Sequence, residues 1–314
     1  MIQANTLTKY YGNSRGIERI SFTVEQGEIV GLLGLNGAGK STILKILGCF
    51  LLPSGGKASI GGFDVEDESH KVRALVGYLP DTPPLYDEMD VSSYLSFVAA
   101  LKGVPPKQVG DSVNIVLDRT NLKEVEDVRI LDLSHGFRQR VGIAQALVHN
   151  PPVLIFDEPI NGLDPVQIVE MRDLILNLKG KHTVILSSHI LSEVTKTCDR
   201  MMIVDQGKLV AQGSESSLKA GLRDHQEFVC QARSITPAIL EHVRSMSAIK
   251  NMKHSTIRGV DTLNIEATSD IRSELARILV QNGADLLTLK ASDDDLENLF
   301  VKLIDQKSEL SGGQ

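Results

Sequence analysis

A spacing of glycines, a lysine and a serine that suits phosphate binding occurs early in the chain, in the sequence GLNGAGKS at residues 34–41. Glycines at such positions let backbone N–H groups turn toward phosphate oxygens, because no side chain obstructs their approach. Lys40 is placed to reach the β- and γ-phosphates, and the hydroxyl of Ser41 is placed to ligate Mg²⁺. The spacing therefore predicts a site for a nucleoside triphosphate with its magnesium ion.

The residues on either side of this sequence predict a strand before it and a helix after it. The segment 28–33 is apolar apart from its first residue, and the segment 42–47 has helical character. A helix that begins at the loop adds the positive end of its dipole to the phosphate site. The residues expected to contact the nucleotide here are Asn36, Gly37, Ala38, Gly39, Lys40, Ser41 and Thr42.

Two further apolar segments end in side chains that can do chemistry. Residues 153–158 read VLIFDE, and residues 183–189 read TVILSSH. Continuous apolar runs are typical of parallel strands covered on both faces, and ligands bind at the carboxyl ends of such strands. Asp157 can bind Mg²⁺ through a water molecule, whereas its neighbour Glu158 can orient or deprotonate an attacking water. His189 falls at the same edge of the predicted sheet.

Two more positions have both a structural and a functional interpretation. Ser134 precedes a predicted helix that runs to Leu147, so it is expected to be the N-cap of that helix, with or without a ligand. Tyr11 lies just before the turn Gly12–Asn13 and upstream of the phosphate loop. Its ring can stack on a nucleotide base, and packing at a strand end is the alternative.

Composition limits the class of protein and the cellular compartment that we expect. A chain of 314 residues, 42% apolar and 23% charged, predicts two globular domains. The net charge of −7 argues against nucleic acid as a partner. There is neither an apolar run of the ~18 residues that a membrane helix needs nor a secretion signal, so a cytoplasmic location is expected. Three widely spaced cysteines agree with a reducing compartment.

The pattern of strands and helices divides the chain into two domains. Residues 1–27 suggest antiparallel strands, and residues 81–150 suggest a helical insertion with helices over 92–104 and 109–117. Beyond residue 222 the predicted order is β-α-β-β-α-β followed by a last helix at 294–304, which indicates a small ferredoxin-like domain. The predicted boundaries are 1–220 for the nucleotide-binding domain, 221–309 for the small α+β accessory domain and 310–314 for a flexible tail.

Taken together, the motifs resemble those of the ATP-binding subunit of ABC transporters. The matching segments are GLNGAGKS at 34–41, LSHGFRQR at 133–140, LIFDEP at 154–159, NGLD at 161–164 and SSH at 187–189. The resemblance extends over most of residues 1–215. It implies an α/β fold of the P-loop NTPase class of ABC type, with a parallel core sheet, an antiparallel β subdomain and a helical subdomain at about 81–150.

The resemblance also implies roles for individual residues and partners. Two copies are expected to form a dimer around two ATP molecules, with Ser134 and Gly136 of each copy facing the γ-phosphate bound by the other. His189 is expected to contact the γ-phosphate and to support Glu158, and Tyr11 to stack on adenine. A transmembrane permease on a separate chain is expected to contact residues 81–105, which would place the protein at the inner face of the cell membrane. The C-terminal domain resembles that of exporter-type subunits, so export is favoured.

The chain departs from the family pattern at several positions. Asp81 stands where glutamine commonly contacts Mg²⁺ and water, so Asp81 is expected to take part in the metal site. His135 and Phe137 replace a glycine and a glutamine that are common there. The family's commonest signature, LSGGQ, occurs at 310–314, but it ends the chain with no helix after it, and we interpret it as part of the tail.

Two functions other than that of a transporter ATPase are compatible with an ABC-type nucleotide-binding domain. A soluble ABC-type ATPase that acts on ribosomes or DNA would resemble two cassettes in one chain or contain a long coiled coil, and this chain has one cassette and no sustained heptads. A nucleotide-binding regulator without turnover is disfavoured because Glu158 and His189 are retained. The sequence therefore predicts an ATPase subunit.

Overall fold

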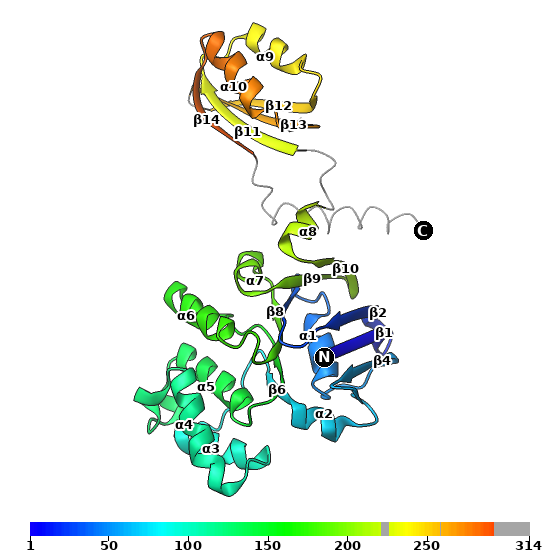
Figure 1. Ribbon diagram of the computed structural model, residues 1–314, viewed down its shortest axis with the longest axis vertical. Coiled ribbons are helices and arrows are strands. Elements are labelled where there is room, and N and C mark those ends of the chain that lie inside the picture. Colours follow the sequence, from blue (N-terminus) through cyan, green and yellow to red (C-terminus); the bar gives the residue numbers. More distant parts are fainter. Residues whose placement is uncertain (221–225, 258, 292–314) are drawn as a thin grey trace. The chain divides into compact units, whose positions relative to one another are not determined.

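The computed structural model describes residues 1–220, 226–257 and 259–291 (Figure 1). The chain divides into two units between Ser214 and Glu215, slightly before the predicted boundary at residue 220. The first unit has two large hydrophobic clusters and the second unit has one of its own. The last helix predicted at 294–304 and the tail at 310–314 lie outside the described residues.

The first unit begins with an antiparallel sheet in the strand order β2-β1-β4-β5. In β2, Ile20, Phe22 and Val24 are buried while Ser21 and Thr23 are exposed, as alternation along a strand with one covered face requires. This alternation predicts the antiparallel strands of residues 1–27. Its strands are β1 (Ile2–Tyr11), β2 (Ser14–Val24), β4 (Gly55–Ile60) and β5 (Phe63–Asp64).

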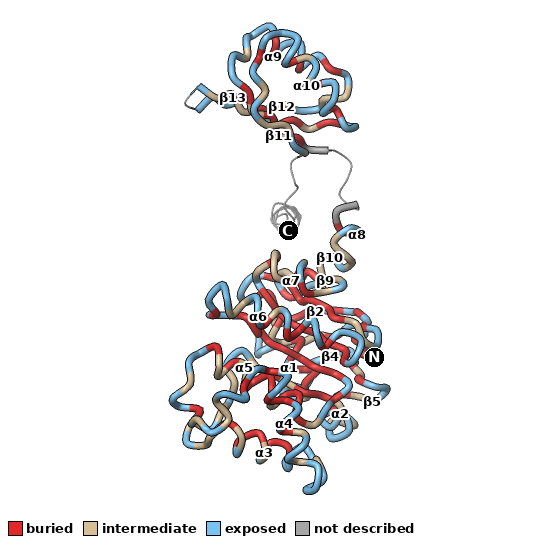
Figure 2. The backbone as a smooth tube through the Cα atoms, turned by 60° about the vertical axis from the view of Figure 1, so that its left-hand side comes forward, coloured by how far each residue is buried: buried red, intermediate tan, exposed pale blue. Residues whose placement is uncertain are grey.

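A six-stranded sheet in the order β10-β9-β3-β8-β7-β6 forms the centre of the first unit. The pairs from β6 to β9 are all parallel, and β10 pairs with β9 in the antiparallel direction. Every residue of β3, β7 and β8 is buried, as the continuous apolar runs predict, and Figure 2 shows that buried segments fill the interior of the first unit. The strands are β3 (Ile29–Leu33), β6 (Val76–Leu79), β7 (Val153–Phe156), β8 (Thr183–Ser188), β9 (Arg200–Asp205) and β10 (Lys208–Gly213).

The helical subdomain lies between β6 and β7 in the sequence. Asp90 caps its first long helix by accepting a hydrogen bond from the N–H of Ser93 at 2.7 Å. This helix ends at Leu101, earlier than the predicted end at 104, because Gly103 takes a left-handed φ of 80°. The elements are α3 (Val91–Leu101), η1 (Pro106–Gln108), α4 (Val109–Arg119), η2 (Lys123–Val125), η3 (Ile130–Asp132) and α5 (His135–Leu147).

The two faces of the central sheet pack into different clusters. Val153 and Ile155 of β7 pack with α1 and the antiparallel sheet, whereas Leu154 and Phe156 pack with the helical subdomain and α6. Because side chains alternate across a strand, one short strand joins both clusters. The remaining helices of this unit are α1 (Lys40–Leu47), α2 (Ser69–Leu75), α6 (Pro165–Leu176) and α7 (Leu191–Thr197).

In the second unit, α8 (Glu215–Ala220) precedes an antiparallel sheet in the order β12-β13-β11-β14. Along the chain the sheet elements and two helices follow the sequence β-α-β-β-α-β, which is the ferredoxin-like arrangement that the sequence predicted. Helix α9 begins at Pro237 after Thr236, whose hydroxyl caps it. The elements are β11 (Gln226–Arg233), α9 (Pro237–Arg244), β12 (Ile249–Ile257), β13 (Val260–Ala267), α10 (Arg272–Gln281) and β14 (Asp285–Ala291).

Candidate nucleotide-binding and hydrolysis site

The candidate site is a cleft of about 530 Å³ at the carboxyl edge of the central sheet. The strands β3, β8, β7 and β6 are parallel neighbours, so the segments that follow them meet at this edge. The cleft brings together residues that are far apart in the sequence. Its lining is Tyr11, Gly16, Leu35, Asn36, Gly37, Gly39, Lys40, Ser41, Thr42, Asp81, Glu158, Asn161 and His189.

Two glycines of the phosphate loop are required for different physical reasons. Gly39 has a φ of 108°, and a Cβ there would lie 2.7 Å from Cγ2 of Ile17. Gly37 has a φ of 82°, but a Cβ there would meet nothing within 4 Å. Gly39 is therefore required by packing and by its backbone conformation, whereas Gly37 is required by its backbone conformation and leaves the approach to the loop open.

Lys40 lies at the start of α1 and is only 5% exposed. Its ammonium group donates a hydrogen bond of 2.7 Å to the carbonyl oxygen of Gly34 and lies 3.2 Å from Oε1 of Glu158. The other carboxylate oxygen of Glu158, Oε2, lies 2.9 Å from Nδ1 of His189. Both oxygens of Glu158 are thus oriented by side chains from two other elements, and the carboxylate is directed into the cleft.

Asp157 is oriented by two serine hydroxyls. Ser41 donates to its Oδ1 at 3.1 Å and Ser187 donates to the same oxygen at 2.7 Å. Burial raises the pKa of Asp157, and the hydrogen bonds from Ser187 and Ser41 oppose that rise. The hydroxyl of Ser187 also accepts the backbone N–H of Glu158 at 2.8 Å. Ser187 belongs to the motif SSH, but no feature of the sequence indicates this role for it.

The turn that follows Glu158 brings a second unpredicted residue, Asn161, into the cleft. Glu158 itself has a φ of 50°, and its carbonyl oxygen accepts the N–H of Asn161 at 3.1 Å. The side-chain amide of Asn161 donates to Oδ1 of Asp81 at 3.5 Å. Asp81 therefore lines the cleft, and its partner there is a residue 80 positions away in the sequence.

Tyr11 and Thr42 meet at the rim of the cleft, where their hydroxyl oxygens lie 3.2 Å apart. Tyr11 is 49% exposed and lines the cleft, where an aromatic ring can stack on a planar ligand. Ala38 is buried instead and does not line the cleft, and its N–H donates to the carbonyl oxygen of Leu35 at 3.1 Å. Of the predicted loop residues, Ala38 thus contributes to the conformation of the loop.

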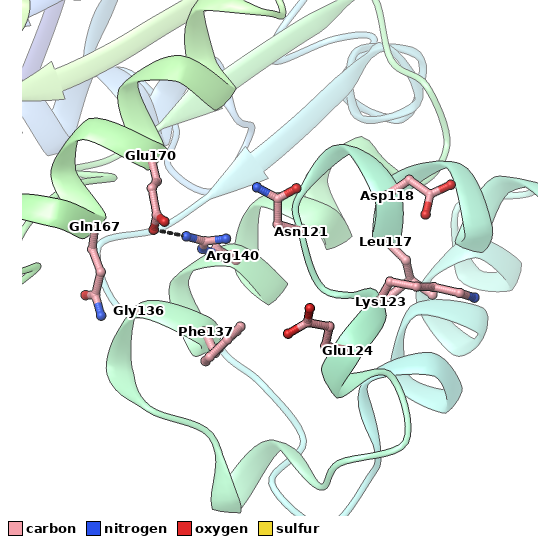
Figure 3. A pocket seen from close by; sticks show the side chains of 10 residues that line it. All are labelled: Leu117, Asp118, Asn121, Lys123, Glu124, Gly136, Phe137, Arg140, Gln167 and Glu170. Atoms are coloured by element: carbon pink, nitrogen blue, oxygen red, sulfur yellow. Dashed lines mark hydrogen bonds and ion pairs between the residues drawn. The ribbon is translucent and has the colours of Figure 1, made fainter.

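Ser134 and Gly136 lie outside this cleft. The hydroxyl of Ser134 accepts the N–H of Phe137 at 3.4 Å, which makes Ser134 the N-cap of α5, as predicted. Gly136 lines a second pocket, of about 510 Å³, between α5, α6 and the end of α4 (Figure 3). The two residues therefore do not reach the nucleotide cleft of their own chain.

The arrangement of these groups suits the hydrolysis of a phosphate anhydride. Glycine N–H groups and the Lys40 ammonium can stabilise negative phosphate oxygens, and hard oxygen donors lie beside them at Ser41 and Asp157. Glu158 is placed to act on water. Within the described part of the chain, no three histidine, cysteine, aspartate or glutamate side chains gather into a metal-binding cluster.

Comparison with known proteins agrees with this geometry. The family described as ABC transporter matches residues 17–161. The bacitracin transport ATP-binding protein BcrA of Bacillus licheniformis is 32% identical over 306 residues, which cover 97% of each chain. The linearmycin resistance ATP-binding protein LnrL of Bacillus subtilis is 31% identical and covers 96% of this chain and 98% of its own.

Solved structures of ABC transporter ATP-binding proteins are also similar to this chain. A structure titled as the ATP binding subunit of an ABC transporter is 31% identical, with a TM-score of 0.65 over 71% of this chain and 94% of its own. The protein cbiO1 of Clostridium perfringens, part of the ABC transporter complex cbiONQ, is 28% identical, with a TM-score of 0.64 over 70% of this chain and 90% of its own.

The chain belongs to the ABC transporter family. Within that family it is an ATP-binding subunit and an ATPase, a P-loop motor of transport. The resemblance, the fold class and the ATPase function that the sequence predicted are confirmed.

Proposed function

We propose that two copies of the chain bind two ATP molecules between them and that Glu158 directs a water molecule at the γ-phosphate. The observation that carries this proposal is the pair of contacts to its carboxylate, from Lys40 at 3.2 Å and from His189 at 2.9 Å. Contacts from both sides hold the carboxylate in one orientation, as a residue that must meet a water molecule at hydrogen-bond distance needs. In this scheme Lys40 contacts the phosphates and His189 orients Glu158.

We assign Mg²⁺ to the position between Ser41 and Asp157. Their oxygens lie 3.1 Å apart at the end of the phosphate loop, and both are hard ligands of the kind that magnesium prefers. Asp81 adds a carboxylate to the lining of the same cleft. When bound, Mg²⁺ neutralises charge on the phosphates, while Ser187 keeps the carboxylate of Asp157 aligned.

The dimer is proposed because Ser134 and Gly136 lie outside the cleft of their own chain. Helix α5 has 13 residues and a capped N-terminus, which is a favourable place for a phosphate group. In a dimer this N-terminus faces the γ-phosphate bound by the partner subunit. Each of the two sites is then complete only when both copies contribute.

A membrane permease on a separate chain is the proposed partner. Tyr86, Phe97 and Leu101 are 53%, 38% and 69% exposed near the start of the helical subdomain, and the rings of Tyr86 and Phe97 lie 5.5 Å apart. An exposed apolar cluster of this kind is suited to receive a helix of another protein. Across residues 1–220, 226–257 and 259–291, no helix is long and apolar enough to cross a membrane. We therefore place the protein peripherally at the inner face of the cell membrane.

The direction of transport is proposed to be export. The relatives named for bacitracin transport and linearmycin resistance match this chain over nearly its full length, so the match includes the second unit as well as the ATPase. A shared accessory domain supports a shared type of transporter. Nucleic acid is not a proposed partner, because the net charge of the chain is −7.

The test is ATP turnover by the purified chain as a function of its concentration, with Glu158→Gln beside it. We expect turnover to rise faster than linearly with protein, because a dimer hydrolyses and a monomer does not. Glu158→Gln should reduce turnover by about 10² or more and should accumulate as an ATP-bound dimer in size-exclusion chromatography. Glu274→Gln, a surface carboxylate of the second unit, is the matched control and should behave as the wild type.

Turnover that is linear in protein and insensitive to Glu158→Gln would contradict the proposal. Such a result would leave either a requirement for the permease or a nucleotide-binding protein that does not hydrolyse ATP.

A further inference from the structure

Helix α5 contacts the segment that follows Glu158 at two points. Gln139, which is 2% exposed, donates from Nε2 to the carbonyl oxygen of Pro159 at 3.1 Å. The Nε2 atom of His135 lies 3.2 Å from the carbonyl oxygen of Asn161. Since a carbonyl oxygen only accepts, Nε2 of His135 is the donor in this pair. The start of α5 and the segment behind Glu158 are thus joined by two side-chain hydrogen bonds.

Residues 158–162 form a tight turn against α5. Glu158 has a φ of 50° and Gly162 a φ of 72°, and the turn closes with the hydrogen bond from the N–H of Asn161 to the carbonyl oxygen of Glu158. A Cβ at Gly162 would lie 3.1 Å from Nε2 of His135, so there is little space between the turn and the helix. Because the turn is compact, a displacement of α5 shifts the backbone that carries Glu158.

The same turn reaches the nucleotide cleft of its own chain through Asn161. The amide of Asn161 contacts Asp81 at 3.5 Å, and both side chains line the cleft. His135 and Asp81 are two of the positions at which this chain departs from the residues common in the family. Asn161 contacts both of them, and a glycine at position 135 would have no side chain with which to do so.

Helix α6, which follows the turn, also packs on the start of α5. A Cβ at Gly136 would lie 2.6 Å from the side chain of Gln167, and Arg140 forms an ion pair with Glu170 (Figure 3). The first turns of α5, the turn 158–162 and the first turns of α6 are therefore one packed unit. We therefore expect a movement of the N-terminus of α5 to be transmitted to the turn and to α6.

We propose that His135 and Gln139 are positioning residues that couple the two ATP sites of the dimer. The inference rests on the proposed function, in which the N-terminus of α5 faces the ATP of the partner subunit. Binding of that ATP orients α5, and α5 orients Glu158 in the site of its own chain through these two hydrogen bonds. Each site is then most active when the other is occupied, because the ATP in the other site favours the productive position of the shared turn.

The test compares kcat and the Hill coefficient for ATP hydrolysis in three variants at position 135. His135→Gly restores the common family residue, His135→Phe keeps a ring without the donor, and His135→Gln retains a side-chain N–H. Loss of one hydrogen bond corresponds to a kcat about fivefold lower. We expect this decrease in kcat, and a Hill coefficient near 1, for the Gly and Phe variants. The Gln variant should keep both within about twofold of the wild type.

Gln139→Leu provides an independent measurement, since it removes the buried hydrogen bond to Pro159. We expect a kcat about tenfold lower and a Hill coefficient near 1. Thermal unfolding of every variant shows whether the chain remains folded. A merely structural role would lower the unfolding temperature and leave the Hill coefficient unchanged, and that result would overturn the inference.

Combining His135→Gly with Glu158→Gln separates this inference from the dimer proposal. If Glu158→Gln alone does not form an ATP-bound dimer, the proposed function fails. Suppose instead that Glu158→Gln forms the dimer both alone and in combination with His135→Gly. If the single variants His135→Gly and His135→Phe then retain the wild-type kcat and Hill coefficient, only the coupling by His135 is refuted. A wild-type Hill coefficient of 1 would also refute the coupling.

Discussion

Replacing Ser187 by alanine removes one hydroxyl that makes two buried hydrogen bonds in the site. The hydroxyl donates to Oδ1 of Asp157 at 2.7 Å and accepts the N–H of Glu158 at 2.8 Å, and Ser187 is itself fully buried. Alanine leaves the N–H of Glu158 without this partner in a place that excludes water. The variant therefore tests whether Ser187 aligns both carboxylates.

The cost follows from the two lost contacts. An unsatisfied buried N–H costs about 1–3 kcal/mol, and a hydrogen bond to a charged group contributes about 1.5–3 kcal/mol. Because both contacts belong to one atom, we expect a combined loss of about 3 kcal/mol in the free energy of unfolding. For a unit of this size that loss lowers the unfolding temperature by about 6–12 °C.

The pH dependence of this loss has a definite sign. The pKa of Asp157 is raised by burial, and the hydrogen bond from Ser187 is the largest contribution that lowers it. Without Ser187 that pKa rises further, so the folded state binds a proton more tightly and loses stability as the pH rises through the new pKa. The destabilisation by Ser187→Ala should be largest near pH 7 and should shrink toward pH 4, because a carboxyl that is protonated in the folded state has no charge for the hydroxyl to stabilise.

The assay is differential scanning calorimetry of the full chain at several pH values, with ATP turnover measured in parallel. The matched control is Ser188→Ala, the next residue of β8, which is also buried but whose hydroxyl accepts the N–H of Ile190 at 3.0 Å and does not contact Asp157. We expect Ser187→Ala to reduce kcat by at least tenfold and Ser188→Ala to reduce it little. Equal losses of stability and activity in the two variants, or no pH dependence of their difference, would refute the reasoning.

Three further predictions follow from the structure. Lys40→Ala should weaken ATP binding about a hundredfold in a fluorescent-nucleotide titration, because the ammonium group is buried beside the phosphate loop, and unchanged affinity would contradict its assigned role. Gly39→Ala should destabilise the first unit by about 2 kcal/mol in calorimetry, whereas Gly103→Ala, also at positive φ but without a close neighbour, should cost less, and equal costs would contradict the packing argument. In the second unit, hydrogen bonds from Thr256, and to a smaller extent from His254, lower the pKa of Asp261 below its ordinary value of 3.8. The lowered pKa stabilises the fold at pH values above 3.8, and this contribution to stability is lost as the pH falls through the pKa of the folded state. Thr256→Val should therefore cost about 1 kcal/mol at pH 7 and less below pH 4, and a pH-independent cost in urea unfolding would exclude this origin.

Local sequence was sufficient to predict most helices and strands, and to predict which strands end in the residues that carry the chemistry. The apolar runs of β7 and β8 follow from burial on both faces, and the glycine spacing after β3 follows from the close approach that a phosphate loop requires. The order of elements in the second unit was also readable, because each helix and strand has its own periodicity and boundary residues. These features depend on interactions between residues that are close in the sequence, so they can be predicted from the sequence alone.

The contacts between distant segments were decided by the tertiary structure alone. Ser187 joins Asp157 and Glu158 across 30 and 29 positions, and Asn161 meets Asp81 across 80. Serine and asparagine have many ordinary roles in loops and strand ends, so their types carry no signal until the strand order is known. The sequence by itself determined which residues could do the chemistry. Only the packing of parallel strands at one edge, and of α5 against the turn behind Glu158, decided which of them act together.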